Sequence, residues 1–162
     1  MIGMNEMTAK AVISCLEIDV DFYRELTVFL MKKNTKILQD DLDWLMESLN
    51  TEQGYIMKSQ ALEQKRLSLF EALGIGGRKL AELIDEAPQE YAPKMRMLSQ
   101  QFIELIDSVK QLNTQNDDIV KRKLANQEEF IKRAGIFNKP ETYDKTASKV
   151  AHGSAAKVFR EV

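Results

Sequence analysis

An apolar side chain recurs every three or four residues along one stretch in the second half of the chain. This spacing matches the period of an α-helix and places those side chains on one face. The stretch predicts a long amphipathic helix that begins near Pro93, a residue suited to the first helical turn, and ends near Arg133. Such a helix must bury its stripe against another helix, because isolated helices gain little stability from propensity alone. The repeat consists of Leu98, Phe102, Leu105, Val109, Leu112, Asn116 and Ile119, and Ile106, Asn113 and Val120 widen it.

A similar repeat near the N-terminus predicts a first helix from Thr8 to Leu38. β-Branched residues are frequent before Phe22, so a short strand or an irregular arm over residues 1–21 is an alternative. The apolar positions of this repeat are Val12, Leu16, Val20, Tyr23, Leu26, Leu30 and Ile37.

A second long helix is predicted from about Leu42 to Leu73, with Asp40 or Asp41 available to accept the free backbone N–H groups at its start. Its length points to a coiled coil or an elongated bundle. The seam is apolar at both ends and polar in the middle. It contains Leu42, Leu45, Leu49, Ile56, Phe70 and Leu73, interrupted by Glu52, Ser59, Glu63 and Arg66.

Three glycines, Gly74, Gly76 and Gly77, end this helix, since glycine readily adopts the left-handed conformation that closes helices. A short helix from Arg78 to Glu86 follows. Short connectors favour antiparallel neighbours. The sequence therefore predicts an all-α fold: an elongated antiparallel bundle of three long helices plus a short helix, with coiled-coil-like packing. The bundle would occupy residues 1–134, and the small, polar and basic residues 135–162 predict a flexible C-terminal tail.

Charge and cysteine content limit the partners that this chain can have. Its 23 Lys and Arg against 25 Asp and Glu give a net charge of −2, which argues against a nucleic-acid partner. The single cysteine, Cys15, excludes an internal disulfide and indicates a reducing cytoplasm. No apolar run approaches the ~20 residues that span a bilayer, so stable membrane insertion is not expected.

Residues for catalysis or metal binding are not evident. His152 is the only histidine, and a metal site usually needs several nitrogen or sulfur ligands at defined spacing. The run from Gly74 to Arg78 lacks both a preceding strand and the Lys-Ser/Thr of a phosphate-binding loop. We expect no catalytic residues, no metal and no cofactor.

Two features of the helices leave alternatives open. Asn113 and Asn116 lie on or beside the strongest apolar seam, where a buried Asn sets register or hydrogen-bonds a guest helix. The chemistry of a seam Asn favours the register role for these two residues. The eight methionines could form an adaptable binding face, although gap-filling in the core is the commoner role of this residue.

The segment from Leu112 to Ile119 reads Leu-Asn-Thr-Gln-Asn-Asp-Asp-Ile and resembles the Leu-Asn-x-x-Asn-x-x-Ile/Leu signature of FlgN-type flagellar export chaperones. Residues 39–45 are similar to the junction between the family's first two helices. Leu62-Glu63-x-x-Arg66, followed by Leu73-Gly74, resembles its Leu-Glu-x-x-Arg region. Tyr143-Asp144 resembles its C-terminal Tyr-Asp-x-x-Gly, with Ala147 in place of the glycine.

This resemblance implies a cytosolic chaperone for flagellar type III secretion. Its clients would be hook-associated proteins, whose C-terminal helical segments it would bind, keep from premature assembly and deliver to the export gate and its ATPase components. Tyr143 is the candidate for gate docking. The expected client-binding residues, on one helix seam, are Phe102, Leu105, Val109, Leu112, Asn113, Asn116 and Ile119, which would use helix-in-groove recognition.

Two other functions compete with this interpretation. A structural coiled-coil spacer or self-assembling subunit would form a stable oligomer that buries every apolar seam among copies. Separately, a homodimer of this chain is among the partners that we consider. A helical regulator of nucleic acid would need a basic face, and the run Lys121-Arg122-Lys123 supplies only a short one, beside Asp117 and Asp118.

Overall fold

Helices make up nearly all of the backbone in residues 3–133, the part of the chain that the computed structural model describes. They are α1 (Glu6–Leu38), α2 (Leu42–Glu47), α3 (Leu49–Ala72), α4 (Leu80–Glu86) and α5 (Ala92–Arg133). No strand occurs within this range, so the predicted all-α class is confirmed.

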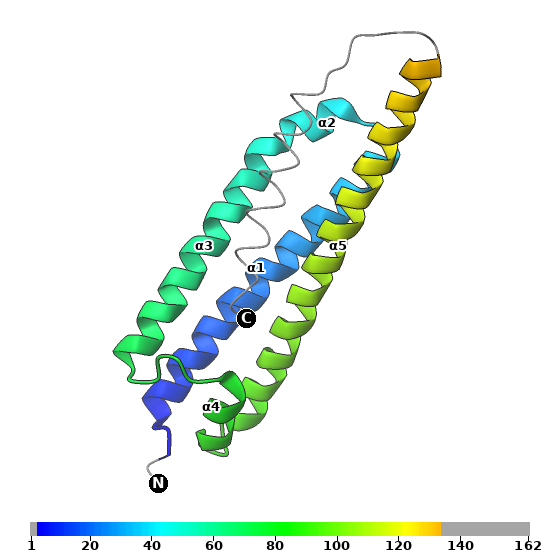
Figure 1. Cartoon of the computed structure of the whole chain (residues 1–162). Helices are drawn as coiled ribbons and strands as arrows, with labels where there is room; N and C mark the ends of the chain where they lie inside the picture. Colours follow the sequence, from blue (N-terminus) through cyan, green and yellow to red (C-terminus); the bar gives the residue numbers. More distant parts are fainter. Residues whose placement is uncertain (1–2, 134–162) are drawn as a thin grey trace.

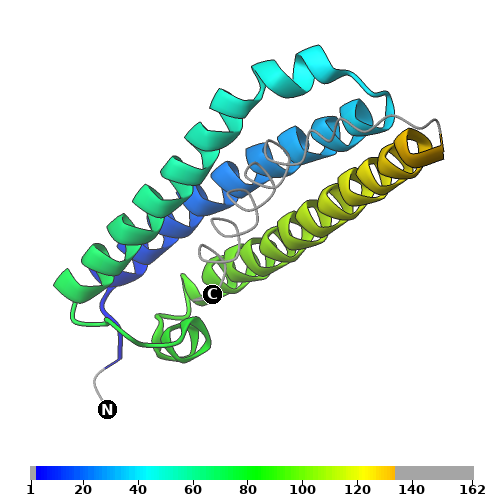
Figure 2. The same cartoon turned by 45° about the horizontal axis from the view of Figure 1, so that its top comes forward.

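α3 runs antiparallel to α1, whereas α5 runs parallel to α1, and α1 lies between the other two long helices (Figures 1 and 2). α5 packs along α1 over most of its length, whereas α3 makes far fewer contacts with α1. α3 and α5 share at most a marginal contact with each other. The elongated up-down-up bundle is therefore built on α1, and α3 is its least tightly packed long helix. Helices that follow one another along the chain are antiparallel, as predicted, but the main interface, between α1 and α5, joins two parallel helices.

α1 is a single helix of 33 residues that begins where Asn5 caps it: the Thr8 backbone N–H donates to the Asn5 side chain at 2.7 Å. Val12 and Leu16 are completely buried, so the helix already packs in its first turns. Burial along this stripe outweighs the modest helix-forming cost of β-branched residues. The alternative of a strand or irregular arm before Phe22 is therefore wrong from Glu6 onward.

The predicted helix from Leu42 to Leu73 is interrupted at Ser48, so it forms two helices instead of one. Asp41 begins α2 by accepting a hydrogen bond from the Trp44 backbone N–H at 3.1 Å. Ser48 is buried, and its hydroxyl donates to the Leu45 carbonyl at 2.9 Å. Serine side chains compete in this way with the regular helical pattern, which is a physical reason for the interruption.

The glycine stop after α3 has the expected form. Gly74 has a φ of 74°, and its N–H donates to the Glu71 carbonyl at 3.0 Å, while the Ile75 N–H donates to the Phe70 carbonyl at 2.9 Å. These two bonds make a Schellman motif, and the apolar contact that accompanies such motifs is present because Ile75 and Phe70 are both buried. The chain thereby turns into α4.

α4 closes one end of the bundle. Its Leu83 and Ile84 are buried in the core, and the Met4 N–H donates to the Glu86 carbonyl at 2.9 Å, which ties the start of the chain to this helix. The core is continuous from this end along α1 and α5. Its largest completely buried side chains are Leu16, Leu30, Leu83, Met95, Val12, Val20 and Val109.

Candidate functional site

The predicted client-binding seam of α5 divides into two rows in the structure. One row, Phe102, Val109 and Asn116, is at most 6% exposed and lies in the contact with α1. The other row, Leu105, Leu112 and Ile119, repeats every seven residues and is half-buried. Asn113 is also half-buried. The first row holds the bundle together, and the second retains apolar surface along the flank of α5.

Asn116 is a structural member of the seam. Its amide Nδ2 donates to the Leu30 carbonyl at 3.2 Å, and its Oδ1 accepts from Asn34 Nδ2 at 2.9 Å. The side chain is 3% exposed, and both bonds reach α1. These hydrogen bonds form only when α1 and α5 stand at one position relative to each other. A shift of either helix would leave the buried amide without partners, at a cost in free energy, so Asn116 has the register role that the sequence favours.

α3 is attached to α1 by a buried ion pair. Arg66 Nη1 lies 2.9 Å from Asp19 Oδ2, and the two side chains are 15% and 2% exposed. The Arg66 guanidinium also lies 5.5 Å from the centre of the Phe102 ring on α5, so this side chain touches all three long helices. The sequence indicated Arg66 as a polar interruption of an apolar seam but did not identify Asp19 as its partner.

A second set of contacts joins the other half of α3 to α1. Lys33 Nζ lies 2.6 Å from Glu52 Oε1, with both side chains at most 20% exposed. Tyr55 packs between Phe22 and Phe29, with ring centroids 6.1 Å and 5.1 Å away. The polar middle of the α3 seam therefore faces α1 and is paired there, which explains why an otherwise apolar seam contains Glu52 and Arg66.

Burial shifts the pKa of three groups around this junction. Loss of solvent raises the pKa of Asp19, although the charge and hydrogen bond of Arg66 oppose the shift. Burial raises the pKa of Tyr23 to about 12 and that of the Cys15 thiol to about 11. A thiol with so high a pKa is protonated at neutral pH, so Cys15 is not a reactive nucleophile.

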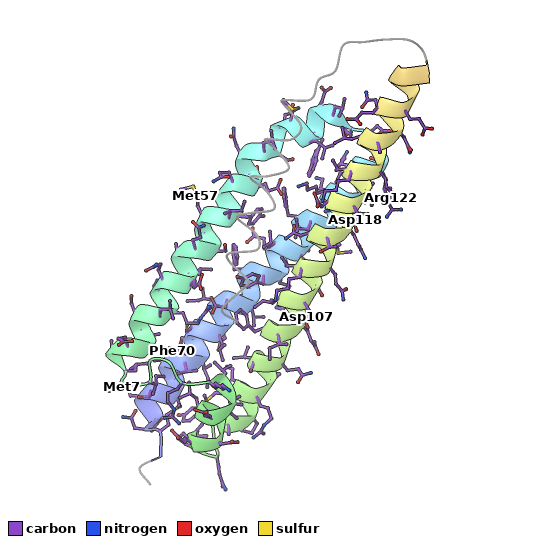
Figure 3. The ribbon with its side chains drawn as sticks, in the orientation of Figure 1. Met7, Met57, Phe70, Asp107, Asp118 and Arg122 are labelled. Atoms are coloured by element: carbon purple, nitrogen blue, oxygen red, sulfur yellow. The ribbon has the colours of Figure 1, made fainter. Side chains whose placement is uncertain are left out.

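Apolar side chains on α2 and the start of α3 project into solvent. Leu42, Met46 and Leu49 are 70%, 56% and 50% exposed. Leu42 and Met46 are four residues apart and so are neighbours on one face of α2, and Leu49 begins α3 directly after the interruption at Ser48. Leu42 and Leu49, which the predicted seam placed in the interior, are therefore surface residues. Farther along α3, Met57 also points away from the bundle (Figure 3).

The described residues contain neither a metal-ligand cluster nor a membrane-spanning helix. They hold no group of three His, Cys, Asp or Glu side chains that could bind a metal ion. In the same range, no helix is both long and apolar enough to cross a membrane. Tyr143 and His152 lie outside this range.

These features define a class: all-α proteins of long packed helices whose remaining apolar rows suit contact with another polypeptide. The family model described as FlgN protein matches residues 4–150. The chain therefore belongs to the FlgN family, whose members are flagellar export chaperones. The predicted resemblance is confirmed. No curated protein and no solved structure matches the chain.

Proposed function

We propose that this chain is a cytosolic chaperone that binds the C-terminal helical segments of hook-associated proteins, prevents their premature assembly and delivers them to the flagellar export gate. Family membership supports the chaperone role. The half-buried row Leu105, Leu112 and Ile119 on α5 is the observation that supports the client site.

The arrangement of the helices favours a client on the flank of α5. α3 and α5 both pack on α1 and hardly touch each other, so among the described residues neither of these two helices covers the flank of the other. A client helix with an apolar stripe could lie there, in the manner of a helix in a groove. Leu105, Leu112, Asn113 and Ile119 would touch it.

The buried row has a different part in this proposal. Phe102, Val109 and Asn116 are buried against α1 and hold α5 in place. They would therefore support the client site without contacting the client. Covering the exposed stripe of a client would keep that stripe from self-association. A contact of one helix only gives moderate affinity, which suits a chaperone that must release its client at the gate.

Copurification with a hook-associated protein tests this proposal. We expect a 1:1 complex by light scattering, formed through the client's C-terminal segment. A stable oligomer of the chain alone that excludes every such client would instead support the structural spacer. For gate delivery, we propose Tyr143 as the docking residue. Tyr143→Ala should leave the client complex intact and reduce client export, and unchanged export would contradict this role.

A further inference from the structure

The corner formed by α2 is both apolar and acidic. Leu42, Met46 and Leu49, here called the α2 strip, are at least half exposed. Asp43 and Glu47 lie one residue further along and are also exposed. Between Gln39 and Met57 the sequence contains five acidic residues and no Lys or Arg.

Two of these five carboxylates have no ion-pair partner in the part of the chain that the structure describes. Asp40, Asp41 and Glu52 pair with Lys123, Lys36 and Lys33 at 2.6, 3.0 and 2.6 Å. The remaining two, Asp43 and Glu47, flank the α2 strip. An occupant of this surface should therefore combine an apolar stripe with positive charge.

From this composition and position, we infer that the α2 strip is a docking surface for residues 147–162 of the same chain. That segment carries Lys149, Lys157 and Arg160 against a single acidic residue, Glu161. Its apolar residues Ala151, Ala155, Val158 and Val162 repeat at helical spacing, and the first three match the four-and-three spacing of the α2 strip.

The covalent connection permits this contact. Lys123 of α5 pairs with Asp40 directly before α2, so α5 passes this corner ten residues before Arg133 (Figure 1). Those ten residues extend the helix by ~15 Å. The thirteen residues 134–146 can span up to ~43 Å, which is ample for a return to α2. A tethered segment has an effective concentration of about 1 mM, so a contact with a dissociation constant below about 1 mM would be mostly occupied.

A second copy of the chain is a poorer occupant. In a symmetric dimer through the α2 strip, Asp43 and Glu47 of both copies would face one another, and like charges at an interface are destabilising. The inference concerns the free chain and does not depend on which client the chaperone binds.

Zero-length carbodiimide cross-linking of the full chain, followed by mass spectrometry of the monomer, tests the contact directly. This reagent joins a carboxylate only to an amine in contact with it. We expect links from Asp43 or Glu47 to Lys149 or Lys157 that weaken at high salt. Leu42→Ser with Met46→Ser keeps the acids and removes apolar surface, so the yield of these links should fall about ten-fold.

Asp107 provides the matched control, because it is an exposed carboxylate on the side of α5 away from α3 (Figure 3). Asp107→Asn should leave the links unchanged, whereas Asp43→Asn with Glu47→Gln should abolish them. Links that join two chains, or tail lysines that couple to Asp107 as often as to Asp43, would overturn the inference. So would unchanged yield in the double serine variant.

Discussion

Arg66 of α3 and Asp19 of α1 form an ion pair of 2.9 Å in which the carboxylate is 2% exposed. Only Ser59 and Phe70 are buried on α3, so this pair is a large part of what attaches that helix. Buried ion pairs gain little net stability over apolar contacts, because desolvation offsets their attraction. The pair therefore specifies where α3 lies more than it strengthens the bundle.

Replacing one partner of this pair should be far more damaging than replacing both. Arg66→Met leaves the Asp19 carboxylate buried without its cation, and we expect a loss of about 3–5 kcal/mol in the free energy of unfolding. Asp19→Leu with Arg66→Met should recover most of it. Urea denaturation followed by circular dichroism measures both. A double variant as unstable as the single one would show that the pair is itself stabilising.

α3 should open before the other long helices. Its contacts with α1 are few, and only Ser59 and Phe70 of α3 are buried, whereas α1 and α5 share a continuous apolar interface. Hydrogen exchange reports local opening, so amides of α3 should exchange well before those in the middle of α1 and α5. Equal protection in all three helices would contradict this order.

Much of this fold follows from the sequence, because the apolar repeats and the glycines at the end of α3 are local signals. The interruption at Ser48 could not be predicted in this way, since it depends on one buried hydroxyl that donates a hydrogen bond to the Leu45 carbonyl. Asp19 also gave no signal of its own. The Asp19 side chain lies on the surface of α1 and is buried there because α3 places Arg66 beside it.

The sequence predicted the proposed client site only as a whole seam of α5, without dividing it into a buried and an accessible row. Periodicity places Phe102 and Leu105 on the same stripe of α5, yet the packing of α1 covers the first and leaves the second half-buried. Which row of a wide stripe stays accessible depends on the angle at which a neighbouring helix packs, and that angle is not encoded in the spacing of one helix.

Removal of the Asn116 side chain tests its register role. Asn116→Ala removes the two hydrogen bonds of this buried side chain, to the Leu30 carbonyl and to Asn34. We expect this loss to lower the free energy of unfolding by about 1–3 kcal/mol. Asn126→Ala, at an exposed position of the same helix, should change it by less than ~0.5 kcal/mol. Equal thermal stability of the two variants would rule out this role.

Cys15 should react slowly with alkylating reagents while the chain is folded. Burial raises its pKa to about 11, so the reactive thiolate is scarce at pH 8. At pH 8, alkylation should be about 100-fold slower than that of a free thiol with a pKa of 9.0, and it should recover in urea. Because Cys15 is the only cysteine, mass spectrometry reads the rate directly. Equal rates in the folded and the unfolded chain would show that the thiol is accessible and unperturbed.

Acid should loosen the start of α2. The Trp44 backbone N–H and Lys36 lower the pKa of Asp41, so the folded state favours the ionised carboxylate. A group with a lowered folded pKa stabilises the fold above its unfolded pKa, and this contribution is lost as pH falls through the folded value. Fluorescence of Trp44, the only tryptophan, should therefore change below about pH 4. The change should be smaller in Asp41→Asn, which keeps an oxygen acceptor without the titration.

Calorimetric titration with the C-terminal segment of a hook-associated protein tests the central claim, that the flank of α5 binds the client helix. Leu112→Asp places a charge in the proposed contact and should weaken binding about 10–100-fold, from the apolar burial it removes. Ile103→Asp is the control, because Ile103 is 54% exposed on the same helix and outside the row. It should bind as the native chain does. Unchanged binding by a folded Leu112→Asp variant, or equal losses in both variants, would contradict the account.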